Sequence, residues 1–142
     1  YIEQYFATYP KVKEFIDKLV ADAKEKGYTE TMFGRRRPIP ELSSSNFMQR
    51  SFGERVAMNA PIQGTAADII KLAMVRVDEA LRREGLKSRL ILQVHDELLL
   101  ECPPEEVEKA GKLLKDAMEH VIELRVPLLA EVHQGTNWAE AK

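Results

Sequence analysis

The stretch LQVHDELLL, residues 92–100, decides which fold the chain is expected to adopt, because three ionisable residues interrupt an apolar run there. A buried, unpaired charge carries a large desolvation penalty, so His95, Asp96 and Glu97 require either solvent or a cation. Only His95 and Asp96 separate the apolar segments 88–94 and 97–102, which is the spacing of a β-hairpin. A turn at these two residues would expose the acids and allow four leucines to be buried: Leu90, Leu92, Leu98 and Leu100.

Helical periodicity precedes the expected hairpin. Apolar residues recur three and four apart over residues 10–26, and this pattern predicts an amphipathic helix. A short hairpin or extended loop is expected up to Pro40, because glycine and proline punctuate a β-prone stretch. A helix should then run to about residue 59 and end there, since Pro61 follows. A second long helix is expected over residues 64–85.

A further helix and strand are expected after the hairpin. Pro103 and Pro104 introduce a helix that should reach about Glu123. Residues 127–133 read as a last strand, which would join the hairpin. The order of elements therefore predicts an α+β fold, with several helices packed on a small antiparallel sheet made of the hairpin and the C-terminal strand.

Composition limits the classes of protein to consider. The 142 residues are 44% hydrophobic and 31% charged, which is ordinary for a globular domain. The net charge of −2 means that local basic patches would have to bind any anionic partner. The single cysteine, Cys102, excludes an internal disulfide and a cysteine-based zinc site. No apolar run approaches the ~18 residues of a membrane span, so no membrane partner is expected. The chain opens in mid-pattern without a methionine, and we expect it to be cut from a longer protein.

The two acids of the turn have two readings at this point. Asp96 and Glu97 would supply the oxygen ligands that a hard divalent cation prefers. A His-Asp pair also makes a polar hairpin turn that binds nothing. The four residues around the turn do not decide between a metal site and a plain turn.

Two other groups of polar residues are candidates for binding. Arg55, Asn59 and Gln63 are spaced by four, and on a helix this spacing places the first two on one face. Their side chains can contact phosphates, sugars or base edges, although a solvated helix face would look the same. The arginines of GRRRP, residues 34–38, could either hold a phosphate backbone or pair with acids of their own domain.

The stretches QRSFGERVAMNAPIQGTAADIIKLAM, residues 49–74, and LILQVHDELLLE, residues 90–101, together resemble the C-terminal end of family A DNA polymerases of the bacterial DNA polymerase I type. GYTETMFGRRRPIPEL and RVPLLAEVHQGTNWAEAK fit the same family, so the likeness covers the whole chain. The resemblance implies that residues 1–58 are the end of the fingers region with its arginine-rich connector. It implies that residues 59–142 are the C-terminal half of the palm.

The resemblance also implies an activity and a set of site residues. The family is a group of DNA-directed DNA polymerases that add deoxynucleotides to a primer 3′ end by phosphoryl transfer with two Mg²⁺ ions. Asp96 is implied to be a catalytic metal ligand, and Glu97 a supporting catalytic acid beside it. The residues implied to bind DNA are Arg55, Asn59, Gln63 and His95.

The family's other catalytic aspartate and its dNTP-binding helix would lie before Tyr1. We therefore expect the 142 residues alone to be inactive. The implied partners are primer–template DNA, dNTPs and the N-terminal part of the polymerase, and an unpaired sheet edge predicts self-association of the isolated chain. The implied location is the cytoplasm of a bacterium, or of a phage-infected one, in association with the nucleoid.

Two other functions remain open from the sequence. A metal phosphohydrolase of the His-Asp type would use His95 and Asp96, but such domains are helical and need histidines upstream, where this chain has none. A non-catalytic DNA-binding module, or an inactive remnant, is the alternative outside the enzymes. A net charge of −2 disfavours tight DNA binding by this piece alone. A second aspartate on a strand further upstream in the reading frame would favour the polymerase.

Overall fold

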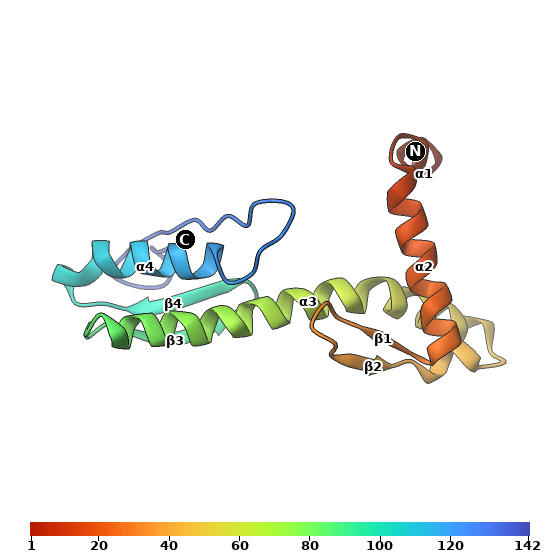
Figure 1. Cartoon of the computed structure of the whole chain (residues 1–142), viewed down its shortest axis with the longest axis horizontal. Helices are drawn as coiled ribbons and strands as arrows, with labels where there is room; N and C mark the ends of the chain where they lie inside the picture. The colour runs from red at the N-terminus through yellow and green to blue at the C-terminus, as the bar shows by residue number, and fades with distance from the viewer. The chain divides into compact units, whose positions relative to one another are not determined.

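The computed structural model describes all 142 residues, which form two compact units, Tyr1–Thr65 and Ala66–Lys142. The chain is α+β, as the sequence predicts, with helices and two separate antiparallel sheets of two strands each (Figure 1). Helix α3, Phe47–Arg83, contributes residues to both units. No helix is both long and apolar enough to cross a membrane.

The N-terminal unit begins with two helices, the second of which packs against a short hairpin. Its elements before α3 are α1 (Ile2–Thr8), α2 (Pro10–Lys26), β1 (Tyr28–Glu30), β2 (Arg36–Pro38) and the 3₁₀ turn η1 (Pro40–Ser43). Helix α2 ends at Lys26, as predicted, and the next residue, Gly27, has the left-handed φ of 80° that glycine adopts without strain. A small core of Ala23, Ile39 and Ala57 joins α2, the segment after β2 and α3.

The predicted helix break at Pro61 is wrong, because α3 runs through Pro61 without ending. A proline inside a helix removes one backbone hydrogen bond and crowds the preceding turn, so other contacts must hold the helix together. The loop after β1 packs closely against α3 on the C-terminal side of the proline. The Met32 N–H donates to Thr65 Oγ1 at 3.0 Å, and a Cβ at Gly64 would lie only 2.6 Å from Thr31 Cγ2.

The C-terminal unit packs a hairpin against two helices. The strands are β3 (Arg89–Val94) and β4 (Glu97–Glu101), and a 3₁₀ turn η2 (Pro104–Glu106) leads into α4 (Val107–Glu119). Figure 1 shows α4 and the C-terminal part of α3 running alongside this hairpin. Val77 and Leu81 of α3 meet Ala110 of α4 in a buried core, against which β4 packs two leucines. Helix α4 ends at Glu119, short of the predicted Glu123.

The hairpin forms where the sequence predicts it, and three of its four leucines are half-buried while one is exposed. A β-bulge lies between Leu90 and Leu92, so Leu90 pairs with Leu100 while Leu92 pairs with Leu99. Because side chains alternate across a strand, the extra residue moves Leu92 to the opposite face. Leu92 is 38% exposed there, whereas Leu98 and Leu100 pack on the core.

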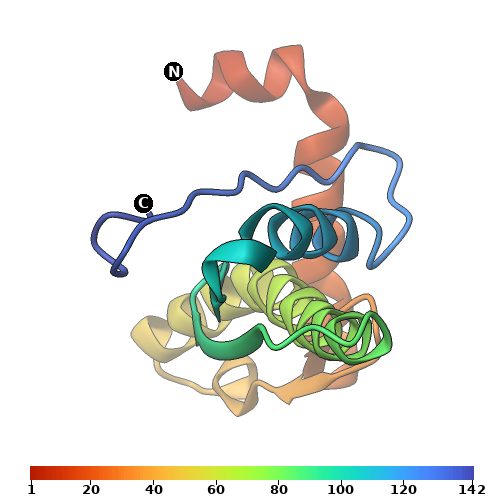
Figure 2. The same ribbon diagram turned by 90° about the vertical axis from the view of Figure 1, so that its left-hand side faces the viewer.

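The predicted strand over residues 127–133 is also wrong, since this segment is coil and joins neither sheet. Its backbone is held by side chains of α4 instead of by a neighbouring strand. Lys115 Nζ donates to the Ala130 carbonyl at 2.8 Å, and the Ala130 N–H donates to Glu119 Oε2 at 2.8 Å. Figure 2 shows the segment passing beside α4. Both strands of the hairpin keep an unpaired outer edge, and self-association of the chain stays a prediction.

Glu106 ties the start of β3 to the start of α4. Its carboxylate accepts hydrogen bonds from the Lys87 N–H at 2.8 Å, the Ser88 N–H at 2.9 Å and the Ser88 hydroxyl at 2.6 Å. The backbone hydrogen bond from Lys87 is the largest cause that lowers the pKa of Glu106, followed by the Ser88 hydroxyl. Ser88 itself is buried, so these bonds fix where the hairpin begins.

We predict that Glu106→Gln destabilises the protein at neutral pH and that this difference disappears in acid. The pKa of Glu106 is lower in the folded chain than its ordinary value of 4.5, so ionised Glu106 stabilises the fold above that pH. The stabilisation is lost as the pH falls below 4.5 and through the folded pKa. Urea denaturation of both proteins across this range measures the difference, with Glu105→Gln as the neighbouring control. A difference that is absent at neutral pH, or that does not change with pH, would contradict the assignment.

Candidate functional site

The turn between β3 and β4 presents its ionisable residues to solvent. Val94 pairs with Glu97, so His95 and Asp96 form a two-residue loop, and all three ionisable residues are exposed. His95 is the one non-glycine residue with a positive φ, at 54°. The side-chain amide of Gln93 donates to the His95 carbonyl at 2.8 Å. The acids therefore avoid burial by occupying a tight turn.

The turn offers an incomplete set of metal ligands. No group of three or more His, Cys, Asp or Glu side chains in the chain could hold a metal ion. Asp96 lies in the loop, while Glu97 begins β4 on the face that carries Leu92 and Leu99. Mg²⁺ is usually bound by one or two carboxylates together with phosphates and water. The two acids fit such a site as partial ligands, because a bound phosphate could supply the remaining oxygens.

Arg55, Asn59 and Gln63 lie on one helix and form a polar line. All three are exposed on α3, and the continuity of α3 through Pro61 extends the line to Gln63, where the sequence alone had predicted a break. Residues four apart on a helix are neighbours on its surface, so the three side chains follow one face. These residues belong to the N-terminal unit, and the turn belongs to the C-terminal unit.

The sequence left open whether the arginines of GRRRP bind a phosphate backbone or pair with acids of their own domain. Arg36 pairs within its own unit, because its Nε lies 3.1 Å from Glu30 Oε1 and its guanidinium lies 4.6 Å from the centre of the Tyr28 ring. Arg37 is exposed and sits opposite Thr29 in the β1–β2 ladder. The structural reading is confirmed for Arg36, and a phosphate contact stays a prediction for Arg37.

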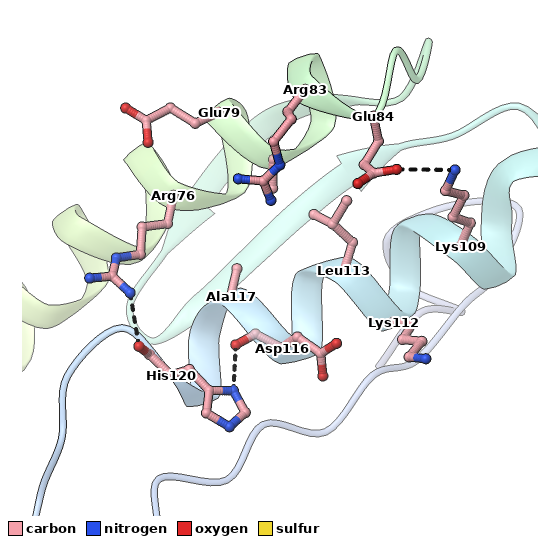
Figure 3. Close-up of a pocket in the computed structure, with 11 residues that line it drawn as sticks. Arg76, Glu79, Arg83, Glu84, Lys109, Lys112, Leu113, Asp116, Ala117 and His120 are labelled. Carbon is pink, nitrogen blue, oxygen red and sulfur yellow. Dashed lines mark hydrogen bonds and ion pairs between the residues drawn. The ribbon is translucent and has the colours of Figure 1, made fainter.

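A groove of about 790 Å³ lies between α3 and α4 and was not predicted (Figure 3). Arg76 donates from Nη1 to the His120 carbonyl at 2.9 Å, and Glu84 pairs with Lys109 at 3.4 Å. Figure 3 shows Arg83 between these two contacts, with the strands of the hairpin behind the helices. The lining residues come from helices far apart in the sequence, so only the fold brings them together.

Comparison with known proteins gives consistent matches along the chain. The family model described as DNA polymerase family A matches residues 1–140. The DNA polymerase I of Geobacillus stearothermophilus is 53% identical over 142 residues, and that of Bacillus subtilis is 50% identical over the same length. Each of these alignments covers 100% of this chain and 16% of the relative, so the chain spans only a small part of the curated relatives.

A solved structure has the same fold as the chain. The POL domain of Pol1 from M. smegmatis, in complex with DNA primer-template and dNTP, superposes with a TM-score of 0.94 at 47% sequence identity. The match covers 99% of this chain and 25% of that chain.

Proposed function

Because the chain belongs to DNA polymerase family A, we propose that it forms part of the polymerising site of a DNA-directed DNA polymerase. In this proposal residues 1–58 are the end of the fingers region and residues 59–142 are the C-terminal half of the palm. The partners are primer–template DNA, dNTPs and the rest of the polymerase chain. The match to a polymerase structure that contains primer–template and dNTP supports these partners.

The single observation that carries the proposal is the exposed acid at the hairpin turn. Asp96 is the second residue of a two-residue loop, and its carboxylate is free to face a phosphate-bound cation. In the proposed reaction the primer 3′-hydroxyl loses its proton to solvent, its oxygen bonds to the α-phosphorus of the dNTP, and the bond from that phosphorus to the pyrophosphate oxygen breaks. Two bound Mg²⁺ ions would stabilise negative charge on the attacking and leaving oxygens. Asp96 would bind one ion directly, and Glu97 would support the site from the adjoining strand.

The polar line on α3 supports a role in holding the copied duplex. Arg55, Asn59 and Gln63 present hydrogen-bonding side chains along one exposed face. Minor-groove acceptors occur on every base pair, so contacts to them sense correct pairing with little preference for sequence. In the proposal these three residues contact template and primer, and His95 lies against the primer terminus. Contacts of this kind suit an enzyme that must copy any sequence.

We predict that Asp96→Asn in the complete polymerase removes nearly all incorporation while DNA binding is largely kept. The amide preserves the shape of the side chain but loses the charge that holds a cation. A fall of about a thousandfold in the single-turnover rate corresponds to ~4 kcal/mol of transition-state stabilisation. Glu97→Gln is the matched comparison and should lose less, because Glu97 points from a strand face and not from the loop. A more damaging Glu97→Gln, or normal turnover by Asp96→Asn, would reverse the assignment.

We predict that Gln63→Ala slows extension most from mismatched primer ends. In the DNA complex the proposed hydrogen bond of Gln63 is buried, and removing one partner of a buried hydrogen bond costs ~1–3 kcal/mol. A mismatched primer end has few other contacts to compensate for this loss. Extension rates from matched and mismatched termini measure the effect. Gln49→Ala is the control, because Gln49 lies on the same helix but accepts a hydrogen bond from Ser44 within its own unit at 2.6 Å. Equal rates for Gln63→Ala and the unmodified enzyme on both termini would contradict the proposed contact.

We predict that the 142 residues alone do not extend a primer. The chain holds no group of three or more His, Cys, Asp or Glu side chains that could hold a metal ion, and in this proposal the rest of the polymerase supplies further metal ligands. Primer extension with Mg²⁺ and dNTPs by the thoroughly purified chain tests this, with the complete polymerase as the positive control. Templated extension that Asp96→Ala abolishes would contradict the prediction. Tight primer–template binding without extension would favour the alternative function, a non-catalytic DNA-binding module.

A further inference from the structure

We propose that Gln93 is a positioning residue that fixes the hairpin turn so that Asp96 is held ready to bind a divalent cation. The inference rests on the proposed function and adds a residue to it. Gln93 does not itself face the cation in this proposal. It acts through the backbone of His95, the residue directly before Asp96.

The first support is the hydrogen bond from Gln93 Nε2 to the His95 carbonyl, at 2.8 Å. A carbonyl oxygen only accepts, so the amide NH₂ must face it, and a carboxylate at position 93 could not replace this donor. Gln93 is half-buried, whereas His95 and Asp96 are exposed. The bond therefore links an anchored side chain to an otherwise exposed loop.

The second support is the backbone conformation of His95. Its φ of 54° lies in the left-handed region, which residues with a Cβ rarely adopt without a compensating contact. Such conformations persist where the surrounding structure restrains them, and they are frequent at functional sites. The bond to the His95 carbonyl restrains the peptide that joins His95 to Asp96. Rotation of this peptide would swing the Asp96 carboxylate.

The third support is the bulge in β3, which sets the direction of Gln93. Because of the bulge, Gln93 pairs with Leu98, and it shares a face with Leu90 and Leu100. Leu98 and Leu100 pack on the core formed by α3 and α4. A regular strand would have turned Gln93 to the opposite face, since one residue of register reverses every side chain. The bulge thus places Gln93 on the packed face, from which it holds the turn.

These three features together make the turn a preorganised support for a metal ligand. A ligand held in position before the cation arrives loses less conformational freedom on binding. Gln93→Met keeps the length of the side chain and removes the donor. Gln93→Glu keeps the shape and places a negative charge against the carbonyl oxygen. Arg89→Met is the matched control, because it removes the contact to Glu101 (3.7 Å) at the open end of the same hairpin.

The test uses the complete polymerase bound to primer–template and dNTP, with a dideoxy-terminated primer so that no chemistry occurs. Mn²⁺ binding is followed by electron paramagnetic resonance. Gln93→Met should raise the half-saturating Mn²⁺ concentration about fivefold to tenfold, the loss expected from one hydrogen bond. Gln93→Glu should raise it further, and Arg89→Met should leave it unchanged. Primer–template affinity and the melting temperature should stay close to those of the unmodified enzyme.

Unchanged Mn²⁺ binding by Gln93→Met would overturn the proposal. So would a loss of Mn²⁺ binding that is matched by equal losses of DNA affinity and melting temperature, because that result indicates a general structural role. Asp96→Asn, measured in the same binding experiment and in a separate extension assay with an unblocked primer, distinguishes a failure of this inference from a failure of the proposed function. If Asp96→Asn binds Mn²⁺ and extends primers normally, the proposed function of the turn fails, whatever Gln93 does.

Discussion

Burial of one face of the β3–β4 hairpin against α3 and α4 is the constraint on which the C-terminal unit depends. Val77, Leu81 and Ala110 form a fully packed surface, and Leu98 and Leu100 of β4 must lie on it. A strand cannot slip by one residue without exposing these leucines, so the register of the hairpin is fixed. The fixed register in turn places a two-residue loop at the point where the sequence has ionisable residues. The exposure of Asp96 therefore follows from apolar packing elsewhere.

Sequence patterns predicted the features that depend on local chemistry. The hairpin turn, the α+β class and the helix end at Gly27 follow from charge, glycine and periodicity within a few residues. The bulge in β3 was not predictable in this way, because the apolar pattern of residues 90–94 fits a regular strand and no local signal marks the extra residue between Leu90 and Leu92. The continuity of α3 through Pro61 was likewise not predictable locally, and Thr31 and Met32, which are distant in sequence, pack against the helix just beyond the proline.

The C-terminal segment is a strand that the sequence predicts and that the structure does not contain. Residues 127–133 are mostly apolar, as a strand can be, but the backbone of Ala130 is held by Lys115 and Glu119 of α4. A strand needs a neighbour to accept its hydrogen bonds, and an apolar pattern cannot say which neighbour is present. The roles of Asp96 and of the polar line on α3 came from resemblance to a family. The structure adds their exposure and the hydrogen bond that holds the turn, but it leaves their roles as proposals.

We propose that the hairpin turn presents Asp96 as a direct ligand of a catalytic divalent cation. A crystal structure of the complete polymerase with primer–template, dNTP and Mn²⁺, in which anomalous scattering locates the ion, tests this proposal. We expect an Mn²⁺ peak at coordination distance from the Asp96 carboxylate, about 2.0–2.3 Å for a small divalent ion bound by oxygen. Peaks coordinated by Glu97 without Asp96, or no peak beside the turn, would contradict it.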